Sequence, residues 1–242
     1  MFDLSRFTLR DMSECGSTLR KLGVGAGSME QAAGRIVRYL YEHLADRTTG
    51  EKACVLVRFF KTCEYERLTP ELQQFACAIL GAPPETAAMR CLTLLATAGG
   101  EPQWNSRSGS VGHQAIPLAS ERLVAQAPMI SSLIQQFGLE LRTVLQPSPE
   151  LLLDLSQRSY NVFHVAEAVG SPYIPAQSDF VRRFGVRSVL GFGGMLPTMN
   201  LFAVILFSRV PIPRETADLF KTLSLCVRVA VLPFAGGAVF GE

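Results

Sequence analysis

The sequence predicts an α+β fold with a central antiparallel sheet, N- and C-terminal helices on one face, and a long loop and helix segment on the other. Three observations indicate this fold. Apolar residues at helical spacing lie near both ends of the 242-residue chain, short β-branched and aromatic runs lie between them, and three such runs occupy the last third. Helices at the chain ends and a long middle segment would cover the two faces of such a sheet.

The composition supports a large hydrophobic core and excludes several functional classes. Hydrophobic residues make up 48% of the chain and charged residues 18%, which is incompatible with disorder. The 23 Lys and Arg residues are scattered and nearly balanced by 21 Asp and Glu, so we expect no nucleic-acid partner. Charges throughout residues 1–20 exclude a signal peptide and predict a cytoplasmic protein. Six scattered cysteines predict reduced, mostly buried thiols.

In the first part of the chain, helices precede the first strand. Residues 2–22 predict an amphipathic helix broken at Gly16. Residues 28–44 carry an apolar stripe, with Ser28 as N-cap and Gln31 at the capping-box position. The expected elements that follow are a strand over 54–60, a short helix over 70–80 that starts after Thr69, and a strand over 91–98.

The middle and the last third differ in character. We expect a loop over 101–114, a helix over 120–137 interrupted at Pro128, and a short helix over 147–157. The last third predicts strands over 160–165, 186–192 and 201–207, followed by a helix over 213–232. Residues 188–208 contain no charge, but their glycines and Pro197 divide them into two strands, so we expect no membrane insertion.

Four segments in the last third resemble the C-terminal half of GAF domains, which are sensory modules. They are Phe163-His164-Val165-Ala166-Glu167-Ala168-Val169, Phe184-Gly185-Val186-Arg187-Ser188-Val189-Leu190-Gly191, Leu201-Phe202-Ala203-Val204-Ile205-Leu206-Phe207 and Arg214-Glu215-Thr216-Ala217-Asp218-Leu219-Phe220. The chain departs from the family pattern at Glu167, where many members have Asp, and at Phe192-Gly193-Gly194, where they have Pro after the Gly.

The resemblance implies a GAF-like sensory domain over 28–234, preceded by a helical extension over 1–27 and followed by a tail or linker over 235–242. It implies a regulatory part of a bacterial signalling protein, such as a two-component system, rather than an enzyme. The output module would be a histidine kinase, nucleotide cyclase, phosphatase or transcription activator. A homodimer through the terminal helices would pass a conformational signal to that module.

A cavity between the sheet and the segment 101–157 is the expected ligand site. Strand ends and the covering loop meet there, and the polar and aromatic residues expected to line it are Trp104, His113, Gln114, Tyr160, His164, Tyr173 and Arg187. The identity of the small-molecule ligand and any cofactor is unknown from the sequence. No His or Cys pair has the spacing of metal ligands, so we expect no metal and no catalytic residues.

Two alternatives remain open. One is a ligand-free dimerisation or interaction module, because the 15 phenylalanines could fill the pocket. The other is a thiol-dependent enzyme similar to free methionine sulfoxide reductase, a GAF-type scaffold, which would use Cys54 and Cys63. That chemistry needs an accessible thiol of low pKa.

Overall fold

The computed structural model describes residues 1–147 and 160–241. Within them, six antiparallel strands form one sheet in the order β5-β4-β3-β8-β7-β6. The strands are β3 (Cys54–Glu64), β4 (Arg90–Gly99), β5 (Ala115–Pro117), β6 (Phe163–Val165), β7 (Ser188–Met195) and β8 (Leu201–Ser208). The last three are neighbours, as the sequence predicts. A separate parallel pair joins β1 (Phe2–Asp3) to β2 (Leu44–Ala45).

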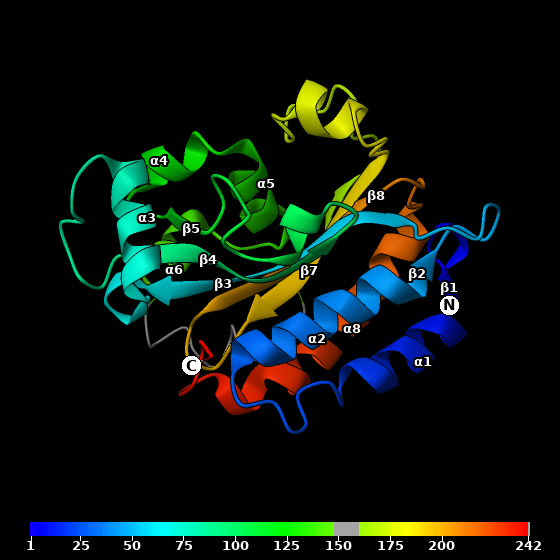
Figure 1. The fold of residues 1–242 in the computed structure, drawn as a ribbon, viewed down its shortest axis with the longest axis horizontal. Coiled ribbons are helices and arrows are strands. Elements are labelled where there is room, and N and C mark those ends of the chain that lie inside the picture. The colour runs from blue at the N-terminus through cyan, green and yellow to red at the C-terminus, as the bar shows by residue number, and fades with distance from the viewer. Residues whose placement is uncertain (148–159, 242) are drawn as a thin grey trace.

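Three helices from the two ends of the chain cover one face of the sheet (Figure 1). They are α1 (Leu9–Leu19), α2 (Met29–His43) and α8 (Arg214–Val231). Their apolar stripes are buried, and Leu19, Leu40 and Phe220 have no exposed surface. Since the stripes repeat at three and four residues, each helix turns one side to the sheet. The predicted terminal-helix layer is therefore confirmed.

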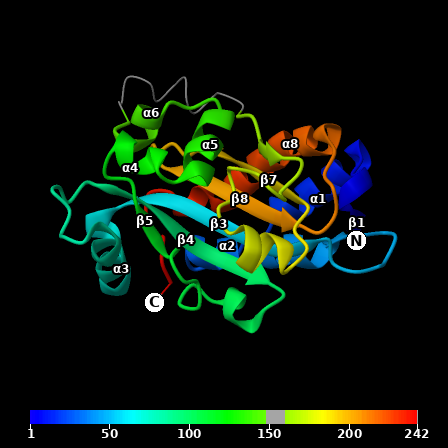
Figure 2. The same ribbon diagram turned by 90° about the horizontal axis from the view of Figure 1, so that it is seen from above.

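The opposite face carries the middle of the chain (Figure 2). It is covered by α4 (Glu121–Ala125), α5 (Pro128–Gln136), α6 (Leu141–Leu145) and a π-helical turn over Gln177–Arg182. The predicted interruption at Pro128 is confirmed, because α4 ends before it and α5 starts at it. The helix α3 (Pro70–Leu80) lies at the sheet edge beside β5. Short 3-10 turns cover Leu4–Arg6, Tyr65–Arg67, Pro102–Asn105 and Leu232–Phe234.

Several elements differ from the sequence predictions. Gly16 does not break α1, because it lies where α1 meets α8: a Cβ there would come within 2.9 Å of Cys226 Sγ. The strand β3 runs four residues further than expected, to Glu64, and β5 was not predicted. The strand expected over 160–165 is shorter, since β6 begins at Phe163. Apart from Pro147, the helix expected over 147–157 lies outside the described residues.

The C-terminal tail and one loop meet at the start of α2. The amides of Met29 and Glu30 donate to the carbonyl oxygens of Ala238 and Val239, each at 2.9 Å. Glu30 also forms an ion pair with Arg107, whose guanidinium lies 5.5 Å from the centre of the Phe240 ring. The tail therefore satisfies amides that a helix start leaves without partners. The division of the chain at residues 27 and 234 stays a prediction.

None of the helices in the described part of the chain is both long enough and apolar enough to cross a membrane. The uncharged residues 188–208 form β7, β8 and the turn between them, as predicted.

Candidate ligand-binding site

A cavity of about 310 Å³ lies between the sheet and the segment that covers it. Its floor comes from β3, β4 and β8, and its cover comes from α5 and the loop around His113. The walls are mainly apolar: Phe60, Leu92, Ile116, Met129, Ile130, Leu133, Ala203, Ile205 and Phe207. An apolar cavity with few polar groups is typical of small-molecule sites.

Arg58 on β3 is the charged side chain in this cavity. It alternates along the strand with Phe59, which belongs to the helical face, so Arg58 and Phe60 both face the cavity. Arg58 is 9% exposed, and its Nη2 donates to Ser110 Oγ at 3.4 Å. Its buried Nε has no hydrogen-bond partner. A buried guanidinium with an unused donor is costly unless an anion completes it.

Burial lowers the pKa of Arg58 to about 10, and the side chain stays cationic at neutral pH. Among the described residues, no carboxylate forms an ion pair with it. The cavity therefore presents a fixed positive charge at an apolar surface. Such a site suits a ligand that combines an acid group with an apolar body.

His113 lies at the rim of the cavity, where the residue keeps an exposed part. Its Nδ1 lies 2.8 Å from the carbonyl oxygen of Val111. Partial loss of water around the ring lowers the pKa of His113, and the charge of Arg58 lowers it further. Both effects therefore favour a neutral His113 imidazole beside the cationic Arg58 at neutral pH.

The structure places the predicted site residues at different distances from this cavity. His113 lines it, whereas Gln114 donates from Nε2 to the Ser108 carbonyl oxygen at 3.3 Å. Trp104 packs edge-on against Phe184, with ring centres 4.6 Å apart, and also contacts Phe180, which contacts the cavity residue Phe207. Trp104 is therefore separated from the cavity wall by the ring of Phe180.

The other predicted residues lie elsewhere in the fold. Tyr160 is buried against Gly194, and His164 on β6 has its Nε2 2.8 Å from the Ile212 carbonyl oxygen. Tyr173 is 43% exposed and Arg187 is exposed beside the start of β7. A ligand role for these residues stays a prediction.

Arg58 escaped the sequence-based selection, although the sequence carries a signal for it. It is the one charged residue in the apolar run from Ala53 to Phe60, and charged residues are rarely buried without a reason. The apolar wall residues carry no comparable signal, because they look like ordinary core.

The cysteines are spread through the structure. All six are free, and only Cys77 is partly exposed. Burial raises the pKa of Cys54 to about 12, so this thiol lacks the thiolate that sulfoxide reduction needs. Within residues 1–147 and 160–241, no three His, Cys, Asp or Glu side chains converge as a metal site would require.

No protein-family model and no curated protein matches this sequence. Solved structures similar to the chain include a GAF domain from a phosphoenolpyruvate-protein phosphotransferase of Coxiella burnetii, at 15% identity, a TM-score of 0.43 and 91% coverage of each chain. A second is free methionine-R-sulfoxide reductase from Neisseria meningitidis with its substrate, at 10% identity, a TM-score of 0.45 and coverage of 95% of this chain and 96% of that one.

A third is a bacteriophytochrome from R. palustris, at 8% identity and a TM-score of 0.41, with 96% of this chain and 39% of that chain covered. The α+β architecture itself is defined by the sheet order and by the two layers described above.

Proposed function

We propose that this chain is a GAF-like regulatory domain that binds a small organic acid in the cavity beside Arg58. The observation that carries the proposal is the buried guanidinium, which has an unpartnered Nε and no ion-paired carboxylate among the described residues. An acid group on the ligand would supply the missing acceptor and the missing negative charge. The ligand acts here as a signal, and no catalytic step is assigned to the site.

The cavity walls define the rest of the ligand. Phe60, Leu92, Leu133 and Phe207 offer apolar contact close to Arg58. The volume of about 310 Å³ lies near the lower end of the range for small-molecule sites. A compact acid with an aromatic or branched aliphatic body fits both properties. A long or highly polar ligand would leave the apolar walls or its own polar groups unsatisfied.

The ligand-free interaction module is the weaker alternative. It would require phenylalanine side chains to fill the cavity, whereas Phe60 and Phe207 line an open space. An unfilled apolar cavity lowers stability, since its lining loses packing contacts. A ligand that fills the cavity would restore these packing contacts and offset the loss of stability.

The signalling part of the proposal follows the family resemblance. The helices α1 and α8 lie on the face opposite the cavity, and α8 exposes Leu225 and Val229 by 48% and 53%. We include in the proposal a cytoplasmic homodimer through these helices and a coupled bacterial output module, such as a two-component histidine kinase.

Replacing Leu225 and Val229 together by Lys should convert that dimer to a monomer in sedimentation velocity. An unchanged sedimentation coefficient would contradict the proposal that α8 forms part of the dimer interface.

The ligand test uses matched pairs of compounds that differ only in charge. Compact aromatic and branched aliphatic acids are screened by thermal shift beside their primary amides, and each hit is titrated by calorimetry. We expect acids, and not amides, to raise the melting temperature, because a ligand that binds only the folded state stabilises it. A pocket that takes amides as well as acids, or neither, contradicts the proposal.

The variant Arg58→Met tests whether acid binding depends on Arg58. We expect it to fold at least as stably as the wild type, because it removes an unpaired buried charge. Affinity for the acid should fall roughly 10- to 100-fold, the usual range for a lost charge-assisted hydrogen bond. Arg38→Met, which removes an exposed cation from α2, is the matched control and should bind like the wild type. Equal affinity in both variants would exclude Arg58 as the anchor.

A further inference from the structure

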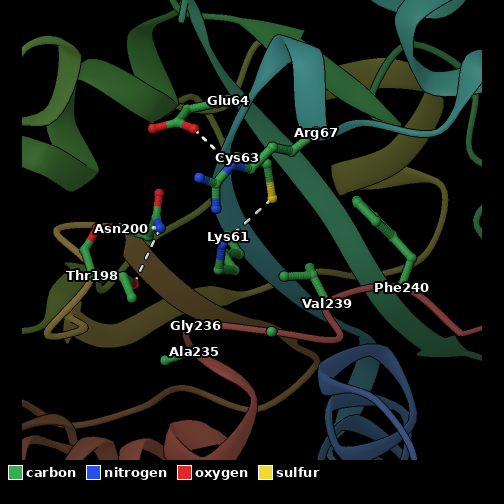
Figure 3. A pocket seen from close by; sticks show the side chains of 11 residues that line it. Lys61, Cys63, Glu64, Arg67, Thr198, Asn200, Ala235, Gly236, Val239 and Phe240 are labelled. Atoms are coloured by element: carbon green, nitrogen blue, oxygen red, sulfur yellow. Dashed lines mark hydrogen bonds and ion pairs between the residues drawn. The ribbon is translucent and has the colours of Figure 1, made fainter.

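A second cavity, of about 390 Å³, lies near the C-terminal end of β3, on the other side of the sheet from the first. Three segments far apart in the sequence form it: the end of β3 with the turn after it, the turn between β7 and β8, and the C-terminal tail (Figure 3). Its lining residues are Lys61, Cys63, Glu64, Arg67, Thr198, Asn200, Ala235, Gly236, Gly237, Val239 and Phe240.

Lys61 is the central charged group of this second cavity. The residue is 3% exposed, and among the described residues its ammonium donates to the Thr62 carbonyl oxygen at 3.2 Å and to Cys63 Sγ at 3.6 Å. An ammonium has three donors, and a thiol sulfur is a weak acceptor. Lys61 therefore keeps hydrogen-bonding capacity that the protein does not use well.

The charges around Lys61 are mostly positive. Burial lowers the pKa of Lys61, and the charges of Arg90 and Arg67 lower it further, against an opposite effect of Cys63. Glu64 is the carboxylate among the lining residues, and its Oε2 is already paired with Arg67 Nε at 2.9 Å. No described carboxylate pairs with Lys61. The cavity thus has more positive than negative charge.

The remaining polar groups surround the cavity from other directions. Asn200 Nδ2 donates to Thr198 Oγ1 at 3.1 Å, which holds the turn side chains together at one wall. Gly236 and Gly237 carry no side chain, and the space where a Cβ would sit is open at both. The tail backbone therefore lines the cavity beside a hydroxyl, an amide, an ammonium and a guanidinium, and the Gly237 amide donates to the Phe234 carbonyl oxygen at 3.3 Å.

We propose that this second cavity binds a small tetrahedral oxyanion of the phosphate class, either free phosphate or a phosphomonoester, with Lys61 as its buried counter-charge. Donors that approach from several directions match a tetrahedral anion better than a planar carboxylate. The tail forms one wall, so a bound anion also holds the tail against the sheet. The inference concerns a different cavity from the organic-acid site and does not rest on it.

The test is binding of inorganic phosphate to the full chain, followed by calorimetry and by amide chemical shifts. Sodium chloride at matched ionic strength is the reference. We expect phosphate to raise the melting temperature and to shift the amide signals of Gly236 and Gly237. A phosphomonoester such as glycerol phosphate distinguishes the two sources: tighter binding of the ester identifies an esterified ligand. Absence of any phosphate-specific effect at millimolar concentration overturns the proposal.

Two variants assign the effect to the cavity. Lys61→Met should lower phosphate affinity at least tenfold, whereas Arg38→Met should leave it unchanged. Asn200→Asp is the second variant: it adds a carboxylate to the cavity and should weaken phosphate binding without removing Lys61. It keeps the test decisive should Lys61→Met fail to fold. Phosphate affinity equal to the wild type in either cavity variant contradicts the assignment.

Discussion

Gly34 and Gly193 are two glycines with opposite environments. Gly34 lies inside α2, and a Cβ there would meet nothing within 4 Å. A Cβ on Gly193 would lie 2.0 Å from the carbonyl oxygen of Phe202 on the paired strand β8. The glycine at position 193 therefore has a packing reason, because β8 comes too close for a side chain there.

Alanine substitution should separate these two positions. We expect Gly34→Ala to stabilise the protein by about 0.5–1 kcal/mol, since glycine is unfavourable inside a helix. Gly193→Ala should destabilise it by roughly 1–3 kcal/mol or more, since the strand must shift to make room. Urea unfolding of both variants measures the free energies. Equal effects of the two substitutions would contradict the described contact between β7 and β8.

Thiol reactivity gives a second prediction at the scale of single residues. Burial raises the pKa values of Cys15, Cys54 and Cys91 to about 12. These thiols should resist alkylation by iodoacetamide in the native protein at pH 8, because the thiolate is the reactive form. Peptide mass mapping should find Cys77 labelled first. Rapid native labelling of Cys54 would contradict its burial and revive the thiol-enzyme alternative.

The helix α1 shows how local sequence sets an element. Thr8 caps it: Thr8 Oγ1 accepts from the Asp11 amide at 3.2 Å, and Asp11 Oδ2 accepts from the Thr8 amide at 3.0 Å. Thr8→Ala should lower the free energy of unfolding by about 1 kcal/mol, a typical value for a lost N-cap. Thr48→Ala, in an exposed turn outside the helices, is the control and should change it less. A larger loss for the control in urea unfolding would contradict this role.

The elements also show which features a sequence can reveal. The N-cap at Ser28, the helix start at Pro70 and the stripes of α2 and α8 depend on neighbouring residues, and they were predicted. The path of α1 through Gly16 depends on contact with α8, some 200 residues away in the chain, which local patterns do not report. The extension of β3 to Glu64 similarly depends on pairing with β4.

The candidate site was less predictable than the fold. Sequence reasoning selected polar and aromatic residues of the covering loop and strand ends, and His113 among them lines the cavity. The cavity itself is made by apolar residues from three strands and α5, whose spacing depends on how the layers pack. Arg58 and Lys61 matter because they lack carboxylate partners in space, and that property appears only once the chain is folded.

At the scale of the whole molecule, stability should depend on pH through two histidines. Desolvation lowers the pKa of both His113 and His164 below the usual value of 6.5. The folded state then favours the neutral rings more than the unfolded state does. Their contribution is complete above about pH 6.5 and is lost as the pH falls through the lowered pKa values.

We therefore expect the free energy of unfolding in urea to fall between pH 7.5 and pH 5. His164→Gln should make that fall smaller, because one of the two groups no longer titrates. His43→Gln is the comparison, since His43 ends α2, where its Nδ1 lies 2.9 Å from the Tyr39 carbonyl oxygen. A fall that His164→Gln leaves unchanged would show that other groups dominate the pH dependence.

The strand β3 separates two compartments, since Arg58 points to one and Lys61 to the other, and β4 and β8 hold it from both sides. A strand that is hydrogen-bonded along both edges bends little. The two cavities therefore share β3 as a wall, but different segments cover them. Arg107 links the two covering segments. Its loop leads to His113 at the first cavity, and its guanidinium lies over the ring of Phe240 in the tail, at the second cavity. Crosstalk between two occupants would pass through Arg107 and around the sheet edge.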